Sequence, residues 1–257
     1  MAYFTIITAT RDAERTLPGL LASLAAQTCR DFTHIVQDGG SRDATVAVAR
    51  AHAERLPELR LESAPDAGIY DAWNTALAAN AASLGEWVLF LGADDRLAAP
   101  DTLTRARALL EGLPPAVRFA SAKALLEDRA TGRLLDISGD AATVPGDLPK
   151  RMPVPHTALF HRASLFSSSR FDASFRIAGD YDFVARHWTA REHGANVDLL
   201  VTIMGDGGLS VDPAHLPLCR EETRRVQRTF FPVRHRIHAV RGAAWRLWSR
   251  LRRPDAG

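Results

Sequence analysis

Two adjacent carboxylates, Asp94 and Asp95, follow a short apolar run that is typical of a buried strand. The segment reads EWVLFLGADDRL over residues 86–97. Two ionised carboxylates in such a place would raise each other's pKa unless a positive charge lies beside them. Their hard oxygen atoms suit Mg²⁺ or Mn²⁺, ions that commonly also bind substrate phosphates. The alternative is a solvated turn in which Asp94 caps the chain and Asp95 is exposed.

Polar side chains also stand where other strand-like runs end. Thr8 and Arg11 lie at the end of the first run, Asp38 follows the second and Asp66 follows the third. A carboxylate at the glycine-rich corner IVQDGG, which contains Asp38, can accept hydrogen bonds from a nucleobase or a ribose. It could equally cap the next helix or stabilise the turn.

The elements that must position these side chains alternate between strand and helix in the first half of the chain. Apolar, β-branched runs predict strands at residues 3–8, 33–37, 59–63 and 86–91. Three- and four-residue apolar spacing predicts helices at 17–28, 43–56, 69–83 and 100–113. This alternation predicts an α/β fold with a mainly parallel central sheet flanked by helices. Because ligands of such sheets bind at the carboxyl ends of the strands, the polar clusters should meet in one crevice.

The pattern changes after about residue 115. Residues 117–139 predict a hairpin, and a loop rich in proline and glycine follows at 140–155. A helix is expected near Asp180, and a last strand runs into the glycine turn GDGG. We therefore expect one folded body over residues 1–219.

Charge is unevenly distributed between this body and the tail that follows. Residues 220–257 carry 11 arginines and three acidic residues, a net charge of +8, whereas residues 1–219 carry −6. An acidic body argues against binding to nucleic acid. Apolar residues recur at helical spacing through 233–253, flanked by arginines and with two tryptophans near the end. Such a basic amphipathic helix can lie on an anionic membrane surface, or dock its apolar stripe on the body or another subunit.

We expect neither a targeting segment nor a membrane-spanning segment in this sequence. The first residues, MAYFTIITATRD, lack the basic region and long apolar stretch of a signal peptide, and no 18-residue apolar run occurs. Cys29 and Cys219 form no metal or redox motif and fit a reducing compartment. We expect a cytoplasmic protein, peripheral on the inner face of the plasma membrane if the tail binds lipid. No pattern indicates an oligomeric state.

Four segments in this order resemble the family 2 glycosyltransferases, which have a GT-A fold: TIITATRD, IVQDGGSRDAT, APDAGIYDAWNTAL and GEWVLFLGADDRL. The segments GIYDAWN, PHTALFHR and FDASFRIAGDYDF are most similar to the bacterial subgroup that builds colanic-acid-type and other surface polysaccharides. The resemblance covers residues 3–212. It implies an inverting transfer of a sugar from a nucleotide-diphosphate sugar to a hydroxyl of a glycan or lipid-linked acceptor. It also implies a nucleotide-sugar half to about residue 115 and an acceptor and catalytic half from 116 to 219.

The resemblance implies roles for the residues at the strand ends. Thr8 and Arg11 would lie on the first nucleotide-binding loop, and Asp38 would contact the base. Asp66 would help to hold the nucleoside, and Asp94 would favour the ribose.

The metal and catalytic positions follow in the same way. Asp95 would ligate Mn²⁺ or Mg²⁺ through the diphosphate, although Ala93 stands where the usual motif has a first acidic residue. Asp180 matches the family's downstream acidic position and would be the general base, with Asp182 in reserve. Since residues two apart on a helix point to different faces, only one of the two should reach the pocket.

Three further residues are candidates for contact with acceptor or phosphate. His156, Tyr70 and Asn74 belong to the resembling segments. For His156 the alternative is a structural role. Tyr70 and Trp73 could stack on a sugar, although for Trp73 a core position is favoured by its helical spacing.

Two other classes of function compete with this interpretation. A sugar nucleotidyltransferase would usually show a glycine-rich, basic phosphate loop near the first strand, and TATRDAERT lacks the glycines. A non-catalytic nucleotide-sugar-binding module of a polysaccharide assembly complex would not need Asp94, Asp95 and Asp180 together. A dehydrogenase is disfavoured because no G-x-G-x-x-G motif follows a strand.

Overall fold

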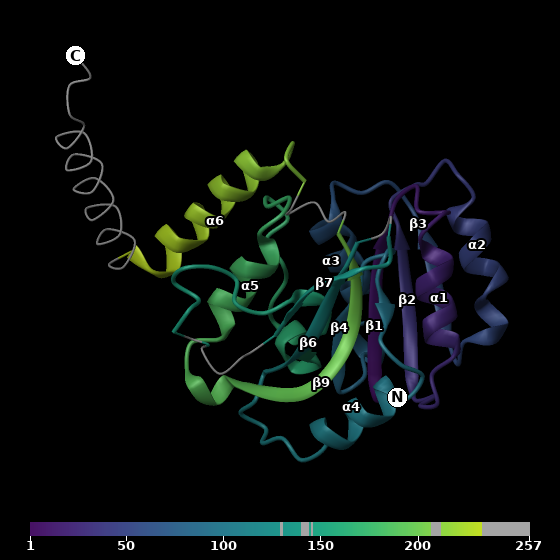
Figure 1. Cartoon of the computed structure of the whole chain (residues 1–257), viewed down its shortest axis with the longest axis horizontal. Coiled ribbons are helices and arrows are strands. Elements are labelled where there is room, and N and C mark those ends of the chain that lie inside the picture. Colours follow the sequence, from purple (N-terminus) through teal and green to yellow (C-terminus); the bar gives the residue numbers. More distant parts are fainter. Residues whose placement is uncertain (129–130, 140–143, 145, 207–211, 233–257) are drawn as a thin grey trace.

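A computed structural model describes residues 1–128, 131–139, 144, 146–206 and 212–232. Within these residues the strands form one sheet with helices on both faces (Figure 1). The strands are β1 Phe4–Thr10, β2 Phe32–Asp38, β3 Leu59–Ser63, β4 Trp87–Phe90, β5 Arg96–Leu97, β6 Phe119–Glu127, β7 Leu134–Ser138, β8 Leu159–Arg162 and β9 Gly194–Gly205. The α-helices are α1 Leu17–Ala25, α2 Thr45–Ala51, α3 Ile69–Ala79, α4 Thr102–Leu110, α5 Gly179–His187 and α6 Leu216–Phe230.

The order of the strands places the four parallel strands of the first half side by side. The sheet runs β3-β2-β1-β4-β8-β6-β9-β5, and β7 also pairs with β6. β1 pairs in parallel with β2 and β4, and β2 pairs in parallel with β3. β8 is antiparallel to β4 and β6, so the second half of the chain makes the sheet mixed. The predicted α/β fold is confirmed: β1 to β4 of the first half pair in parallel, and β6 and β9 of the second half also pair in parallel.

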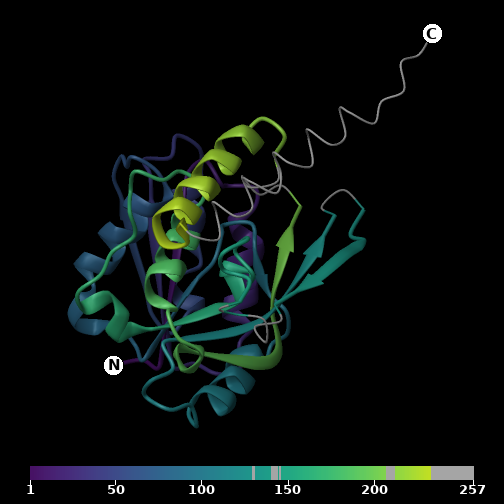
Figure 2. The same ribbon diagram turned by 90° about the vertical axis from the view of Figure 1, so that its left-hand side faces the viewer.

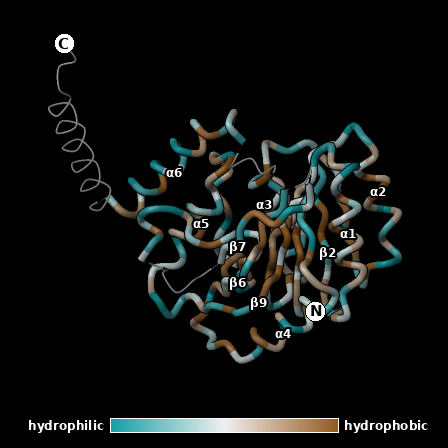
Figure 3. The backbone as a smooth tube through the Cα atoms, viewed as in Figure 1, coloured by the Kyte–Doolittle hydropathy of each residue, from teal (hydrophilic) through white to brown (hydrophobic). Residues whose placement is uncertain are grey.

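Alternation of side chains along the strands builds an apolar core on each face of the sheet. In β4, Trp87 and Leu89 pack into the core beneath α1, α2 and α4, whereas Val88 and Phe90 pack into the core beneath α3 and α5. All four side chains are fully buried, as expected for a strand that is covered on both faces. Figure 3 shows the apolar strands at the centre of the molecule and more polar segments around them.

The helices of the first half form where apolar spacing predicts them. In α1, Leu17, Leu20, Leu21 and Leu24 form the stripe at i, i+3, i+4 and i+7, and all four are fully buried. Pro18 stands in the first turn, where its missing amide hydrogen costs no helical hydrogen bond.

Helix α6 packs against α5 in both ribbon views (Figures 1 and 2). Its buried residues are Glu222 and Val226, which lie one turn apart on the face toward the body. The boundary predicted after residue 219 falls inside this helix, because the helix that starts at Leu216 continues across it. The remainder of the predicted tail, 233–257, lies outside the described residues.

The hairpin, the helix near Asp180 and the last strand of the second half form as the sequence pattern predicts, whereas β8 has no counterpart among the predicted strands. β6 and β7 form the predicted hairpin, which projects from the body in Figure 2. The helix expected near Asp180 is α5, whereas the glycine turn after β9 falls at 207–211, outside the described residues. Over the described ranges, no helix combines the length and the apolar character that crossing a membrane requires.

Candidate active site

Asp38 is the centre of a polar cluster at the carboxyl ends of β1, β2 and β3. The parallel register places it beside Thr10 on one side and Ser63 on the other. Thr10 Oγ1 donates to Asp38 Oδ1 at 3.1 Å, and Ser63 Oγ donates to Oδ2 at 2.6 Å. The amide and the hydroxyl of Ser41 donate to the same carboxylate. These contacts are those of a turn-stabilising aspartate, and contact of Asp38 with a nucleobase stays a prediction.

The charge of Asp38 is stabilised inside this cluster. Burial raises the pKa of the carboxyl, but the hydrogen bonds from Ser41, Ser63 and Thr10 outweigh burial and hold the pKa below its usual value. Asp38 is therefore an ionised, fully buried carboxylate at neutral pH.

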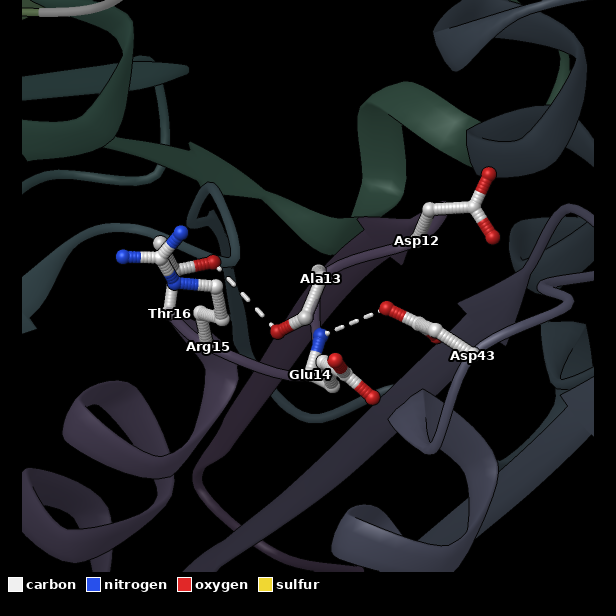
Figure 4. Close-up of a pocket in the computed structure, with 6 residues that line it drawn as sticks. All are labelled: Asp12, Ala13, Glu14, Arg15, Thr16 and Asp43. Atoms are coloured by element: carbon white, nitrogen blue, oxygen red, sulfur yellow. Dashed lines mark hydrogen bonds between the residues drawn. The ribbon is translucent and has the colours of Figure 1, made fainter.

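Hydrogen bonds between side chains and backbone hold the loops after β1 and β2 together. The amide of Asp12 donates to Ser41 Oγ at 2.8 Å, and the amide of Arg42 donates to Asp12 Oδ1 at 2.8 Å. The amide of Glu14 donates to Asp43 Oδ2 at 3.1 Å (Figure 4). The surface pocket drawn in Figure 4 is lined by none of the predicted site residues, so we do not assign the predicted nucleotide-sugar site to this pocket. The hydrogen bonds fix the shape of the loop after β1, in which Arg11 is predicted to contact a nucleotide.

Thr8 and Arg11 occupy different environments. Thr8 is fully buried, and its Oγ1 lies 3.1 Å from Nε2 of His34. Burial lowers the pKa of His34 to about 3, so this ring is neutral. Arg11 is exposed on the loop after β1. Of the two, Arg11 presents its side chain to solvent, whereas the Thr8 hydroxyl contacts His34 of the neighbouring strand β2.

Asp66 joins the cluster from the segment after β3. Its Oδ1 accepts a hydrogen bond from the amide of Gly68 at 3.0 Å. The carboxylate lies so close to Gly39 that a Cβ atom there would come within 2.5 Å of Asp66 Oδ2. Since Gly39 follows Asp38 in the chain, the two predicted nucleoside contacts are neighbours in space. Only glycine at position 39 permits this approach.

The carboxylates of Asp94 and Asp95 both fold back over Gly92. A Cβ atom at Gly92 would lie 2.6 Å from Asp94 Oδ1 and 3.1 Å from Asp95 Oδ2. The amide of Gly92 donates to Asp95 Oδ2 at 2.6 Å. Because β4 lies beside β1, the acidic pair stands next to the loop that carries Arg11. The solvated turn with an exposed Asp95 is excluded, since Asp95 is only 5% exposed.

The environment of Asp95 fits a divalent cation that is shared with a ligand. Burial raises the pKa of its carboxyl to about 7, because the single backbone donor does not replace the lost water. A nearby cation would reverse this shift. Among the residues that the structure describes, no group of three His, Cys, Asp or Glu side chains could hold a metal ion. One or two carboxylates plus substrate phosphates are, however, a common way to bind Mg²⁺.

Asp180 lies in the first turn of α5 and faces Tyr70 of α3. The Tyr70 hydroxyl donates to the carbonyl oxygen of Ile177 at 2.5 Å and lies 3.4 Å from Asp180 Oδ1. Burial raises the pKa of Asp180 to about 6, against the lowering effect of hydrogen bonds from the Tyr181 amide and Tyr70. A carboxylate of this pKa is ionised at neutral pH and basic enough to accept a proton. Since α3 begins just after Asp66, this helix connects the strand-end cluster to Asp180.

Asp182 occupies a different face of α5. It is buried and forms an ion pair with Arg186, one turn further along the helix. Arg186 also donates to the carbonyl oxygen of Arg170 at 3.1 Å. Asp182 is engaged in holding α5, and the prediction that only one of the two aspartates reaches the pocket stays a prediction.

His156 and Trp73 belong to an aromatic cluster beneath the end of β4. The His156 ring stacks 5.0 Å from Trp73 and 5.3 Å from Phe90, measured between ring centroids. Burial lowers the pKa of His156 to about 3, so the ring is neutral. Trp73 is 5% exposed, which confirms its core position.

Tyr70 and Asn74 make internal contacts on one face of α3. Asn74 Nδ2 donates to the carbonyl oxygen of Phe171 at 2.9 Å, and the Phe171 amide donates to Asn74 Oδ1 at 3.0 Å. Tyr70 is 3% exposed, and its hydroxyl is directed to the turn before α5. Contact of these two residues and of His156 with acceptor or phosphate stays a prediction.

Sequence reasoning missed several hydrogen-bond partners at and near the aspartates. Thr10, Ser41 and Ser63 donate to Asp38, and Glu222 of α6 accepts from the turn before Asp180. The hydroxyl residues carry a usable signal, because they stand at the ends of parallel strands or two to three residues after an aspartate. Glu222 carries none, since its position depends on how α6 docks.

The sequence matches the family Glycosyl transferase family 2 over residues 5–165, more than half of the chain. The chain therefore belongs to glycosyl transferase family 2. The matched range includes the cluster around Asp38 and the pair Asp94 and Asp95, and it ends before Asp180.

Relatives with named activities support the same class. The chain is 35% identical over 190 residues to the PGL/p-HBAD biosynthesis glycosyltransferase of Mycobacterium bovis (strain BCG / Pasteur 1173P2), covering 71% of this chain and 68% of that protein. It is 32% identical over 170 residues to an uncharacterized glycosyltransferase of Mycobacterium tuberculosis, covering 64% of this chain and 60% of that protein.

Solved structures share the fold at low sequence identity. TarS residues 1–349 of S. aureus in complex with UDP-GlcNAc matches with a TM-score of 0.60 and 20% identity, over 80% of this chain and 59% of that one. Glucosyl-3-phosphoglycerate synthase of Mycobacterium tuberculosis, with Mn²⁺, UDP and glucosyl-3-phosphoglycerate, matches with a TM-score of 0.60 and 14% identity, over 89% and 79%. The mannosyltransferase PcManGT of Pyrobaculum calidifontis, with GDP-Man and Mn²⁺, matches with a TM-score of 0.58 and 21% identity, over 93% and 64%.

These likenesses confirm the predicted GT-A fold and the predicted enzyme class, a glycosyltransferase. The nucleotidyltransferase and the non-catalytic module are accordingly set aside. The reported relatives are mycobacterial glycosyltransferases, so the coarser family is established and the colanic-acid-type subgroup is not.

Proposed function

We propose that this glycosyltransferase is an inverting, metal-dependent enzyme that moves a sugar from a nucleotide-diphosphate sugar to a hydroxyl of a glycan or lipid-linked acceptor. The observation that carries the proposal is the pair Asp94 and Asp95, folded over Gly92 at the carboxyl end of β4 beside the first nucleotide loop. Structures of the same fold that hold UDP-GlcNAc or GDP-Man support this class of donor. We also propose that the enzyme acts in the synthesis of a colanic-acid-type or other surface polysaccharide, a proposal supported by the motifs GIYDAWN and FRIAGDYDF.

The donor's nucleotide lies, in this proposal, over the carboxyl ends of β1, β2 and β3. Asp38 and Asp66 border the nucleoside from adjacent positions, and the exposed Arg11 reaches the nucleotide from the loop after β1. Asp94 faces the ribose, and the buried hydroxyl of Thr8 supports the loop. The hydrogen bonds between the loops after β1 and β2 preorganise this surface.

Asp95 would hold a divalent cation together with the diphosphate. A bound Mn²⁺ or Mg²⁺ acts as a Lewis acid that stabilises the negative charge developing on the β-phosphate. The amide of Gly92 donates to Asp95 Oδ2 and so fixes the position of the carboxylate that would hold the cation. Neutralisation of two close carboxylates by the same ion accounts for their placement at the end of a buried strand.

Asp180 acts as the general base in a single displacement. The acceptor oxygen forms a bond to the anomeric carbon while the bond from that carbon to the β-phosphate oxygen breaks. The electron pair of the broken bond leaves with the nucleoside diphosphate, and the acceptor proton moves to the Asp180 carboxylate. A pKa of about 6 keeps Asp180 ionised and ready for this transfer at neutral pH.

Release of nucleoside diphosphate from a panel of nucleotide sugars tests the proposal. The purified protein should release UDP or GDP from at least one donor in the presence of Mn²⁺, and EDTA should abolish the release. Product analysis by NMR should show the inverted anomer. Turnover that EDTA does not change, or a retained anomer, would contradict the proposed mechanism.

We further propose that residues 233–253 bring the enzyme to an anionic membrane surface on the cytoplasmic side, where a lipid-linked acceptor would be found. The basic and apolar spacing of this segment supports the proposal. Full-length protein should sediment with vesicles that contain anionic lipid, more weakly at high salt, and protein ending at residue 232 should stay in solution. Equal sedimentation of the two proteins would refute the role of the segment.

A further inference from the structure

A backbone nest lies directly before Asp180 and is filled by Glu222 of α6. The amide of Arg176 donates to Glu222 Oε1 at 2.8 Å, and the amides of Ile177 and Ala178 each donate to Oε2 at 2.9 Å. Consecutive N–H groups that converge on one anion form a concave anion site, and hydrogen bonds to a carboxylate are strong. Glu222 is only 6% exposed, and these three donors replace the water that its charge has lost.

The same turn is held from its other side by α3. The carbonyl oxygen of Ile177 accepts the hydrogen bond from the Tyr70 hydroxyl. The Tyr70 ring packs so closely on Gly179 that a Cβ atom there would come within 2.7 Å of it. Helix α5 begins at Gly179, its N-cap residue makes no side-chain capping bond, and the next residue is Asp180. Glu222 therefore supplies the negative charge that this helix start favours and fixes the turn from which Asp180 projects.

Docking of α6 does not by itself require a buried carboxylate. Val226 is fully buried against the body, and Arg225 lies 4.1 Å over the ring of Phe175 and donates to Asp172 Oδ2 at 2.9 Å. These contacts hold the helix on the segment upstream of the nest. An apolar residue in place of Glu222 would satisfy packing without the cost of burying a charge, but it would leave the three amides of the nest without an acceptor.

We propose that Glu222 is a positioning residue of the glycosyltransferase: by holding the backbone amides of residues 176–178, it orients Asp180 to take the proton of the acceptor hydroxyl. This inference rests on the proposed function, in which Asp180 is the general base. It assigns a role in the reaction to a residue of α6, a helix that lies outside the matched family range.

The test compares two substitutions that remove the same charge from adjacent positions. Glu222→Gln keeps the size of the side chain but points an amide group at N–H donors, whereas Glu221→Gln alters an exposed residue of the same helix. Glu222→Gln should lower kcat by about tenfold to a hundredfold and leave the donor KM within about twofold, because misplacement of a base affects the chemical step. Glu221→Gln should leave both constants within about twofold.

The pH profile separates positioning from general loss of stability. The titratable groups that face Asp180 are Tyr70 from α3 and Glu222 and Cys219 from α6. The negative charge of Glu222 raises the pKa of Asp180, so removal of this charge should lower that pKa. In a plot of kcat against pH, the acidic limb should therefore move to lower pH. Glu221→Gln should leave the limb in place, and Glu222→Asp, which keeps the charge, should lower kcat without that shift.

The outcomes distinguish this inference from the proposed function. Near-normal turnover of Asp180→Asn would remove the base from Asp180 and overturn the proposed function itself. If Asp180→Asn loses turnover while Glu222→Gln keeps normal kcat and an unshifted acidic limb, the positioning role is wrong. If Glu222→Gln does not fold, Glu222→Asp decides: normal kcat in that variant overturns the role, and a lowered kcat with unchanged donor KM supports it.

Discussion

The Tyr70 hydroxyl lies 3.4 Å from Asp180 Oδ1 and at the same time donates to the carbonyl oxygen of Ile177 at 2.5 Å. Tyr70 stands in the first turn of α3, directly after the segment in which Asp66 meets the cluster around Asp38. The start of one helix thus connects the proposed nucleoside site with the proposed general base. A shift of α3 would alter both.

Tyr70→Phe should move the acidic limb of kcat to higher pH. The hydrogen bond from Tyr70 lowers the pKa of Asp180, so its loss should raise that pKa above about 6. Because the base acts in its ionised form, a higher pKa requires a higher pH for full activity. Profiles of kcat at saturating donor check this, with Tyr3→Phe, on the other side of the sheet, as a control. A limb that stays in place or moves to lower pH would contradict the assignment of Asp180.

Gly92→Ala should weaken Mn²⁺-dependent binding of UDP or GDP by about tenfold or more while the protein remains folded. The added Cβ atom would lie 2.6 Å from Asp94 Oδ1 and 3.1 Å from Asp95 Oδ2, and it would displace both carboxylates. Gly112→Ala is the matched control, since a Cβ atom there meets nothing within 4 Å. Titration calorimetry with and without Mn²⁺ makes the comparison. Equal Mn²⁺-dependent affinities in the two variants would rule out the carboxylates over Gly92 as the metal site.

Asp38→Asn should destabilise the protein by about 1–3 kcal/mol at neutral pH, because an amide cannot accept all the hydrogen bonds that this carboxylate accepts. The pKa of Asp38 is lowered in the folded state, so its contribution to stability is present above the pKa of an unfolded aspartate and is lost as pH falls below about 4. Denaturant unfolding from pH 7 to pH 3 should therefore show a smaller acid-induced loss in the variant than in the wild type. A variant as stable as the wild type at neutral pH would show that the charge of Asp38 does not contribute to the stability of the fold.

Local patterns predicted the elements that carry the site. The continuous apolar run in β4 and the stripe of leucines in α1 are properties of neighbouring residues, and both are buried in the structure. Parallel pairing of β1, β2, β3 and β4 then follows from the βαβ order, and it brings Asp38 and the pair Asp94 and Asp95 to one edge of the sheet.

The orientation of individual side chains could not be predicted in the same way. Thr8 ends its predicted strand but turns inward to His34, and Asn74 in the motif GIYDAWN bonds to the backbone of Phe171. Glu222 lies in a stretch that reads as the start of a basic tail, yet it caps the turn before Asp180. These contacts depend on tertiary packing between segments far apart in the chain, which carries no local signal.

The central claim is that Asp95 binds a cation that holds a nucleoside diphosphate, and calorimetric titration of UDP or GDP into wild type and Asp95→Ala tests it most directly. Asp101→Ala, which removes an exposed carboxylate nearby in the sequence, serves as the control. We predict that Mn²⁺ increases nucleotide affinity in the wild type and in Asp101→Ala, and that Asp95→Ala loses this increase. An unchanged Mn²⁺-dependent affinity in Asp95→Ala would contradict the claim.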